Sequence, residues 1–336
     1  MSILRSLLVL CLLAAACSSA AQPTVVPPER AVAIRSLAIP LKLDDPAAAT
    51  VGRLRWRGGI SMTADSARFG GWSDLHVAAD GRSLAAISDE GAWLTATIDY
   101  DARGDLAGLS QARLGPLRDL DGRLLADKAM ADAEGMARLP DGSWLVSFER
   151  DHRLWRYPGL DGKPVAFPGP ADLARQPKNG GVEALTALPD GRVVAISEEL
   201  SQKPSTVTGW IGTPITPGSA DGGYAWASFA YATVPDFVPT AITRLPDGSF
   251  VTLERAFDMV RGVRCRVMHF AAAALQPGAT VQPTELAFLA SPWAVDNLEG
   301  LAATRGPNGE TLLWIVSDDN FNPLQRNILL LFELLP

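Results

Sequence analysis

The sequence predicts an all-β fold, a single β-propeller of five or six four-stranded blades, and three observations support this prediction. First, a hairpin pattern recurs five times, with an Asp-Gly or Asn-Gly turn between two short apolar strands. Second, no segment has sustained helical periodicity. Third, the turn glycines recur every 49 to 61 residues, a spacing typical of one blade per repeat: Gly81, Gly142, Gly191, Gly248 and Gly309.

Each hairpin opens on an acidic or small polar residue and closes on an acidic residue. The two most regular copies have the same length and share a Leu-Pro-Asp-Gly turn. Strand-like segments follow the hairpins at 153–157, 224–233 and 264–270, and we expect these to form outer strands. The five hairpins span Asp74–Asp89, Glu134–Glu149, Glu183–Glu198, Thr240–Glu254 and Glu299–Asp318.

The number of blades stays open at this point. A sixth blade would have to come from residues 31–62. Alternatively, Val51–Met62 supplies the outer strand that closes the last blade. A β-sandwich would have irregular strand lengths and no recurring turn, so the pattern favours the propeller.

Residues 1–20 are expected to be an export signal, because Arg5 precedes an apolar run at 7–16 that is too short to span a bilayer. Two processing routes stay open: a lipoprotein signal that ends before Cys17, or ordinary cleavage after residue 20 or 21. We expect a periplasmic or secreted protein, with membrane attachment only through a lipid anchor on Cys17. Residues 21–30 form a linker rich in Pro and Ala, and the domain covers 31–336.

Charge and cysteine content exclude an internal disulfide and argue against one class of partner. The formal net charge is −7, which argues against nucleic acid as a partner. After loss of the signal, Cys265 is the one cysteine that neither processing route removes or acylates, so an internal disulfide is excluded. Its alternating surroundings, 263–270, favour a buried core thiol. We expect a monomer.

The acidic residues of the hairpins are expected to meet, because an antiparallel hairpin brings its two open ends together. If these are inner strands, their ends converge on one mouth of the central channel. Carboxylates from several blades suit Ca²⁺, which accepts six to eight oxygen ligands. The alternative is that each carboxylate caps backbone amides or pairs with arginine. The candidate metal ligands are Asp89, Glu134, Glu149, Glu183, Glu198, Glu254, Glu299, Asp318 and Asp319.

Four basic side chains are candidate catalytic residues. Guanidinium groups bind phosphate and carboxylate through two hydrogen bonds, so Arg150, Arg255 and Arg326 are expected to hold an anionic group of the substrate. His152 lies near the mouth end of a blade and is the candidate acid or base. The sequence has no Gly-x-Ser-x-Gly elbow, phosphate-binding glycine loop or His-Glu-x-x-His motif.

The C-terminal segment Val316-Ser-Asp-Asp-Asn-Phe-Asn-Pro-Leu-Gln-Arg-Asn327 resembles the phytase-like propeller family, whose members are often labelled "esterase-like activity of phytase". Asn297-Leu-Glu-Gly-Leu301 and Asp132-Ala-Glu-Gly-Met136 carry the same resemblance, which runs from about residue 70 to 336. It implies an exported propeller with calcium-dependent phosphoesterase or esterase activity. The chain departs from the pattern at Ala184, where Gly usually follows Glu, and at Trp72-Ser-Asp-Leu75.

Three functions remain at this stage. The first is a calcium-dependent hydrolase of phosphate or carboxylate esters, acting on a small anionic or ester substrate at the acidic mouth. The second is a non-catalytic propeller of the cell envelope that binds a ligand or protein, in which binding would occur without product. The third is an oxidoreductase or lactonase, which only the acidic channel mouth supports.

Overall fold

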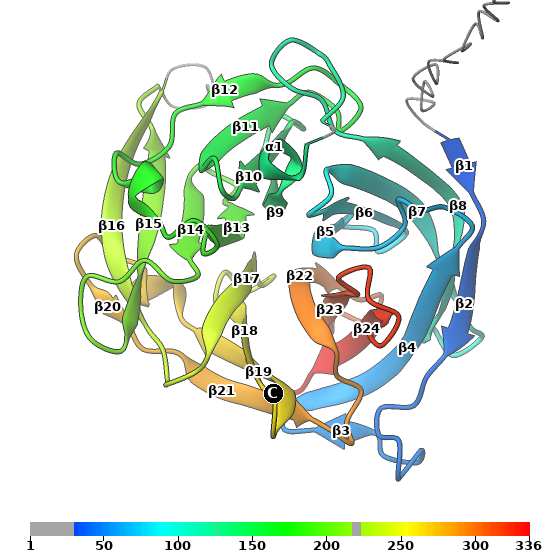
Figure 1. The fold of residues 1–336 in the computed structure, drawn as a ribbon. Coiled ribbons are helices and arrows are strands. Elements are labelled where there is room, and N and C mark those ends of the chain that lie inside the picture. Colours follow the sequence, from blue (N-terminus) through cyan, green and yellow to red (C-terminus); the bar gives the residue numbers. More distant parts are fainter. Residues whose placement is uncertain (1–29, 126, 217–222) are drawn as a thin grey trace, which may run out of the picture.

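The computed structural model describes residues 30–125, 127–216 and 223–336, and these form five β-sheets arranged around a central axis (Figure 1). The predicted propeller is therefore confirmed, with five blades. The expected signal at 1–20 and the linker up to residue 29 lie outside the described residues, and Arg30 opens the first strand. Within the described part of the chain, no helix is long and apolar enough to cross a membrane.

The first two blades hold nine strands, ordered here from the axis outward. Blade 1 consists of β5 (Trp72–Val77), β6 (Ser83–Ser88), β7 (Ala92–Tyr100), β8 (Leu106–Pro116) and β1 (Arg30–Val32). Blade 2 consists of β9 (Ala133–Arg138), β10 (Trp144–Phe148), β11 (Arg153–Tyr157) and β12 (Val165–Phe167). A single helical turn, α1 (Lys128–Ala131), precedes blade 2.

Blades 3 and 4 continue around the ring. Blade 3 consists of β13 (Val182–Ala187), β14 (Val193–Ser197), β15 (Thr206–Pro214), β16 (Tyr224–Ala232) and the short parallel strand β20 (Thr280–Val281). Blade 4 consists of β17 (Val238–Arg244), β18 (Phe250–Asp258), β19 (Gly262–Phe270) and β21 (Thr284–Ala290). Two 3₁₀ turns, η1 (Leu173–Arg175) and η2 (Ala272–Ala274), lie in the connections.

Blade 5 joins the two ends of the chain. It consists of β22 (Asn297–Arg305), β23 (Thr311–Asp318), β24 (Asn327–Leu334), β4 (Leu54–Ala64) and β2 (Ile34–Ala38), with β3 (Thr50–Val51) paired to β4. N-terminal β4 pairs antiparallel with C-terminal β24. The alternative in which Val51–Met62 closes the last blade is therefore confirmed.

The hairpin turns form as their sequences predict. All five turn glycines have positive φ, between 68° and 93°, which a glycine adopts without the strain that a Cβ would cause. In the four Asp-Gly turns the aspartate accepts a hydrogen bond from the backbone N–H two residues later, as Asp141 does from Ser143 at 2.8 Å.

The core is divided among the five interfaces between neighbouring blades, because each sheet buries both faces. Each hydrophobic cluster combines strands of two adjacent blades, as where Trp72 and Trp314 lie in the cluster between blades 1 and 5. Cys265 lies in the cluster between blades 4 and 5 with no exposed surface, so the predicted buried thiol is confirmed.

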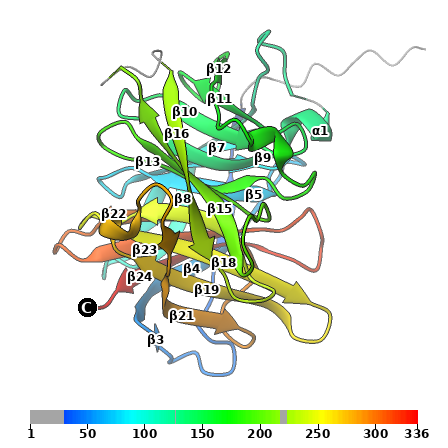
Figure 2. The same cartoon turned by 90° about the vertical axis from the view of Figure 1, so that its left-hand side faces the viewer.

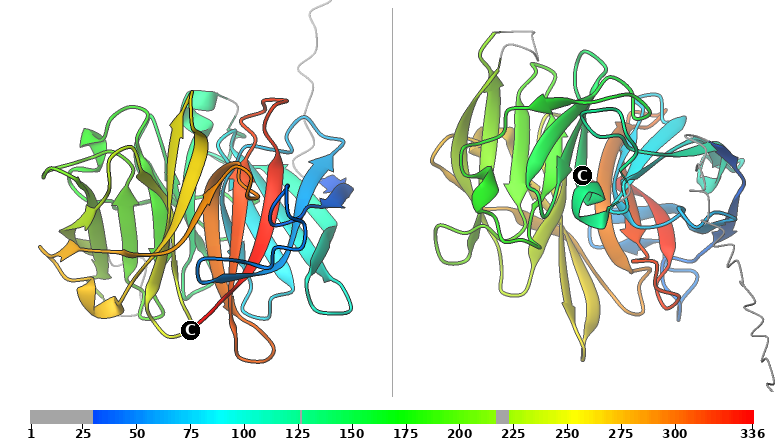
Figure 3. Two further views of the ribbon diagram at one scale, coloured as in Figure 1. Left: turned by 90° about the horizontal axis from the view of Figure 1, so that it is seen from below. Right: turned by 45° about the horizontal axis from the view of Figure 1, so that its top comes forward.

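The channel has two different ends. All five inner strands begin at one end, here called the acidic mouth, and finish at their Asp-Gly or Asn-Gly turns at the other, here called the far opening. Helix α1 and the loop that joins β23 to β24 lie on the mouth side (Figures 2 and 3).

Candidate functional site

A β-bulge at the start of each inner strand positions the mouth residues. The pairing register shifts at this point in all five hairpins, so an extra residue on the inner strand has no direct partner on the second strand. A bulge re-aims its side chain, which explains why acidic residues from separate blades can reach one another at the mouth. The unpaired residues include Ser73, Glu134, Glu183, Thr240 and Glu299.

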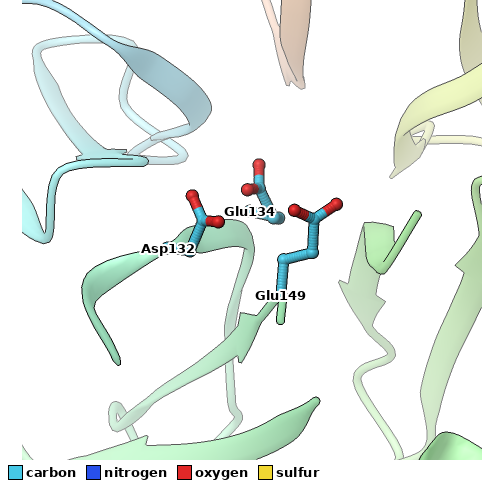
Figure 4. A group of neighbouring side chains, drawn as sticks. All are labelled: Asp132, Glu134 and Glu149. Atoms are coloured by element: carbon cyan, nitrogen blue, oxygen red, sulfur yellow. The ribbon is translucent and has the colours of Figure 1, made fainter. Parts of the chain in front are cut away.

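Blades 2 and 3 carry two overlapping groups of carboxylates. Asp132, Glu134 and Glu149 form one group, in which one oxygen of each residue lies within 4.8 Å of the others. Figure 4 shows these three carboxylates side by side, extending in much the same direction from blade 2. Glu149 also belongs to the second group, with Glu183 and Glu198 at the same spacing. Five carboxylates therefore form two neighbouring oxygen clusters joined by Glu149.

Three more acidic residues border these groups and have partners. Glu299 accepts a hydrogen bond from Asn297 Nδ2 at 2.8 Å, and Asp318 accepts one from the backbone N–H of Asn320 at 2.5 Å. Asp89 pairs with Lys128 at 2.5 Å, but its Oδ1 is buried without a hydrogen-bond partner. Lys128 and Arg150 also pair with Asp132, and Arg255 lies 3.7 Å from Glu198, whereas within the described residues no ion pair engages Glu134, Glu149 or Glu183.

Burial raises the pKa values of these carboxylates. The pKa of Glu149 rises to about 7, mainly through burial and then through the charges of Asp132 and Glu198. Burial likewise raises the pKa of Glu299 to about 8 and that of Asp318 to about 7. The cause is physical: a buried carboxylate loses hydration, and its neighbours carry the same charge. Without a cation, the cluster therefore resists full ionisation near neutral pH.

Glu183 is the least satisfied member of the cluster. Its side chain is 8% exposed, and its Oε2 atom is buried with no hydrogen-bond partner. Burial, and next the charge of Glu198, raise the pKa of Glu183 well above its ordinary value. An oxygen of Glu183 also lies within 4.8 Å of one of Glu198, and two ionised carboxylates offer only acceptors, so neither satisfies the other without a shared proton. An orphaned buried oxygen of this kind is a ligand position that a cation would satisfy.

Blade 4 departs from the predicted ring. Glu254 turns away from the mouth, where its carboxylate accepts from Tyr231 at 2.9 Å and pairs with Arg266 at 3.1 Å, so it is not part of the cluster. Arg255 takes the equivalent place instead. Its guanidinium lies 3.3 Å from Glu299 and 3.7 Å from Glu198. Although burial opposes its charge, these neighbouring carboxylates raise the pKa of Arg255.

The other predicted basic residues also have partners in the structure. Arg150 pairs with Asp132, and Arg326 lies 3.2 Å from Asp296. His152 Nε2 donates to the Pro177 carbonyl at 2.9 Å, which fixes the ring to a neighbouring loop rather than to the carboxylates. These contacts leave no guanidinium of the predicted three without a carboxylate partner.

Two further aspartates have structural contacts at this end. Asp319 accepts from the Gly71 N–H at 2.9 Å and from Asn327 Nδ2 at 2.8 Å, which ties its loop to blade 1. Asp74 accepts from the backbone N–H groups of Met136 at 2.8 Å and Leu301 at 3.4 Å. It therefore links blades 1, 2 and 5 across the channel and is not aimed at the carboxylate groups.

A cavity of about 640 Å³ opens beside the mouth. Its lining includes Asp89 and Lys128, which border the carboxylate groups, together with Phe321 and Arg68. Arg68 is half-buried, and no ion pair or side-chain hydrogen bond engages its guanidinium within the described residues. This cavity can therefore offer an unpaired positive charge to a ligand that reaches the carboxylates.

The residues present fit a hard divalent cation. The donors of both groups are carboxylate oxygens, with no sulfur or nitrogen ligand, and such sets suit Ca²⁺ or Mg²⁺ rather than Zn²⁺. Eight carboxylates face three cationic side chains here, which leaves an excess of negative charge: Asp89, Asp132, Glu134, Glu149, Glu183, Glu198, Glu299 and Asp318 against Lys128, Arg150 and Arg255.

Sequence reasoning missed four residues of this region: Asp132, Lys128, Asn297 and Arg68. A signal existed for the first and third, because both stand two residues before a bulge glutamate within the repeated motif, at Asp132-Ala-Glu134 and Asn297-Leu-Glu299. Lys128 and Arg68 lie outside the repeat, and only the folded chain places them beside the mouth.

Comparisons with known proteins agree with this fold. The family model Phytase-like, described as "Esterase-like activity of phytase", matches residues 67–321. A search of curated proteins gave no significant match. Among solved structures, an α-L-arabinofuranosidase from Podospora anserina is 11% identical, covers 84% of this chain and 97% of its own, and has a TM-score of 0.50.

Two further solved structures are similar at lower scores. A gluconolactonase from Xanthomonas campestris is 13% identical, covers 91% of this chain and 99% of its own, and has a TM-score of 0.42. An endo-arabinase from Bacteroides thetaiotaomicron is 10% identical, with coverage of 84% and 96% and a TM-score of 0.47. At these identities the likeness concerns the fold alone. The family match spans well over half of the sequence, and the chain therefore belongs to the phytase-like family.

Proposed function

We propose that the protein is a metal-dependent hydrolase of small phosphate or carboxylate esters, with its site at the acidic mouth and Ca²⁺ as the cation. One observation carries the proposal: the buried, unpartnered Oε2 of Glu183 within a cluster whose negative charges outnumber its positive ones. Such an arrangement is costly unless a cation occupies it, because buried like charges repel one another strongly.

The proposed ligands are the carboxylates of blades 2 and 3: Asp132, Glu134, Glu149, Glu183 and Glu198. When bound, a divalent cation supplies Lewis acidity, which withdraws charge from an ester oxygen and eases deprotonation of water. The protein's part is to hold these oxygens in place. Lys128 and Arg150 hold Asp132 from two sides, at 2.8 Å for Lys128, and so keep that carboxylate aimed at Glu134.

The substrate would lie in the cavity beside the mouth. Arg68 offers a guanidinium without a carboxylate partner, which suits an anionic substituent of the substrate. Phe321 offers an apolar surface next to it. We therefore expect Arg68→Ala to raise KM for an anionic ester more than for a neutral ester with the same leaving group.

The test combines metal analysis with turnover. Metal content and hydrolysis of a panel of p-nitrophenyl phosphate and carboxylate esters are measured for the untreated protein, the chelator-treated protein and Glu183→Gln. We expect bound calcium, loss of turnover on chelation, and at least tenfold lower metal affinity in the variant, because loss of a ligand should cost no less than the ~10–100-fold that loss of an outer-shell partner costs. Glu285→Gln is the matched control, because Glu285 is an exposed glutamate on outer strand β21 that pairs with Arg266.

Three outcomes would count against the proposal in different ways. Turnover that survives both chelation and Glu183→Gln would exclude metal-dependent chemistry at this mouth. Calcium binding that depends on Glu183 without turnover of any ester would instead favour the second function, a propeller of the cell envelope that binds a ligand or protein. Equal effects of Glu183→Gln and Glu285→Gln would show that the loss is not specific to the cluster.

A further inference from the structure

A second cavity, of about 440 Å³, lies at the far opening of the channel. All five inner strands contribute to its lining, which begins at Leu75, Met136 and Leu301 and continues toward the turns. The backbone N–H groups of these three residues donate to Asp74. Asp74 therefore stands between this cavity and the acidic mouth, and no carboxylate lines the cavity.

Two arginines face this cavity from alternate blades. Arg138 and Arg244 each stand directly before a Leu-Pro-Asp-Gly turn, in blades 2 and 4. Blade 3 has Ala187 at the same place, so a small side chain separates the two guanidiniums along the wall. Within the described residues, neither guanidinium has an ion pair or a hydrogen bond. Both are therefore available to a ligand.

The surroundings hold one of these cations in place. The Arg138 guanidinium lies 4.3 Å from the centroid of the Trp144 ring, a cation–π contact that orients it without using its N–H donors. The nearest turn carboxylate, Asp141, is already paired with Arg156 at 2.6 Å and with Ser143. Asp141 therefore acts on Arg138 through its charge but forms no ion pair with it, so the N–H donors of Arg138 stay available.

The remaining walls are uncharged. Thr186 and Thr243 bring hydroxyl groups, and the other lining residues are apolar except for His76. Burial, and then the charge of Arg138, lower the pKa of His76 to about 4, so the ring is neutral at physiological pH. A ligand that fits these walls has an apolar body as well as an anionic head.

We propose that the far opening is a second binding site, which takes a small organic anion. Its phosphate or carboxylate head lies between Arg138 and Arg244, and its apolar body lies against the aliphatic wall of the inner strands. Guanidinium groups donate paired hydrogen bonds to such oxyanions, and two of them on opposite sides bind one head group from both sides. The site is independent of any cation at the acidic mouth.

The experiment measures binding of phenylphosphonate and of inorganic phosphate by isothermal titration calorimetry on the metal-free protein. Phenylphosphonate has no ester bond, so hydrolysis does not complicate the titration. We expect phenylphosphonate to bind more tightly than phosphate, because its ring fits the apolar wall. The double variant Arg138→Ala/Arg244→Ala should weaken binding at least tenfold, and added Ca²⁺ should leave the affinity of the original protein unchanged.

A matched control and a conservative variant make the test specific. Arg305 also stands three residues before the Asn-Gly turn of its hairpin in blade 5, but it donates to the Gly309 carbonyl and does not line the cavity. Arg305→Ala should therefore bind phenylphosphonate normally. Arg138→Lys/Arg244→Lys keeps both charges but loses the paired donors, so it should bind with intermediate affinity.

Three results would overturn the proposal: no heat of binding for either probe, equal binding by the alanine double variant, or binding that appears only with Ca²⁺. The last result would place the anion at the acidic mouth and would support the proposed function instead. Circular dichroism melts of each variant check that any loss of binding occurs in folded protein.

Discussion

At the scale of single residues, the partners of each buried carboxylate decide what it does. Glu254 and Asp74 are as buried as Glu183, yet both have their oxygens engaged, by Tyr231 and Arg266 or by backbone amides. Glu183 has a buried oxygen with no partner. Burial alone therefore does not distinguish a structural carboxylate from a candidate ligand, whereas an unsatisfied acceptor does.

Asp74 yields a prediction about stability. Asn at this position would keep one acceptor oxygen and place an NH₂ group against backbone N–H donors, so Asp74→Asn should lower the free energy of unfolding by about 2–3 kcal/mol. Urea denaturation at neutral pH measures this. Asp80→Asn, in an exposed hairpin turn, is the control and should change stability far less. An equal loss of stability in both variants would contradict the role of Asp74 in linking blades 1, 2 and 5.

At the scale of elements, the hairpin is the unit that the sequence predicts best. Its turn chemistry and spacing are local, so the five hairpins, their turns and the outer strands β11, β16 and β19 could all be predicted. Which acidic residue reaches the mouth depends on how many residues separate it from the turn. Arg255, not Glu254, is the eighth residue after its turn aspartate, just as Glu149 and Glu198 are after theirs. In blades 2 to 4 the eighth residue after the turn aspartate therefore reaches the mouth, whereas Asp89 and Asp318 in blades 1 and 5 stand nine and ten residues after Asp80 and Asn308.

Some of the site could not be predicted, for physical reasons. The bulges let glutamates of different blades converge, but hydrogen-bond register is a property of paired strands rather than of one sequence segment. Asp74 stands where the other inner strands have Gly or Ala, and its amide donors come from residues 62 and 227 positions away. Arg68, in the connection between β4 and β5, and Lys128, in α1, reach the mouth from segments outside the hairpins, whose placement no local pattern predicts.

The carboxylates of the acidic mouth give a prediction about how stability depends on pH. The folded pKa values of Glu149, about 7, and Glu299, about 8, lie above the ordinary glutamate value of 4.5. A carboxyl group with a raised folded pKa stabilises the fold below its unfolded pKa, and this contribution is lost as pH rises through the folded pKa. The Tm of metal-free protein should therefore fall between pH 6.5 and 8.

The window from pH 6.5 to 8 also avoids an opposing effect of His76 on stability. Burial lowers the folded pKa of His76 to about 4, so His76 makes the fold more stable as pH rises toward 6.5, the ordinary histidine value, and little beyond it. Saturating Ca²⁺ should remove most of the decrease in Tm, since a cation favours the ionised carboxylates. Glu149→Gln should make the decrease shallower. A Tm of the metal-free protein that rises across this window would be incompatible with the raised pKa values.

At the scale of the whole molecule, closure of the ring depends on one strand from the N-terminal part of the chain. β4 pairs with β24 along most of its length, and Arg57 adds ion pairs to Asp105 at 2.7 Å and to Glu333 at 3.1 Å. Blade 5 without β4 would expose the edge of β24, and the apolar faces between blades 5 and 1 would lose part of their cover.

Truncation tests this closure. Removal of residues 1–29 should leave the Tm unchanged, because β1 begins at Arg30. Removal of residues 1–65, which takes away β1 to β4, should abolish the cooperative thermal transition seen by circular dichroism. A cooperative melt at the original temperature after the longer deletion would show that the ring closes without β4.

The pairing of β4 with β24 also means that β4 is synthesised long before the strand with which it pairs. During synthesis β4 emerges about 260 residues before its partner, and at ~5–20 residues per second it waits roughly 13 to 50 s without that neighbour. An unpaired strand of eleven residues is an aggregation hazard. Arg55 and Arg57 charge one end of it, and in the finished ring both pair with Glu333. The two arginines that pair with Glu333 in the folded ring are thus also suited to limit aggregation of β4 in the nascent chain, before β24 is made.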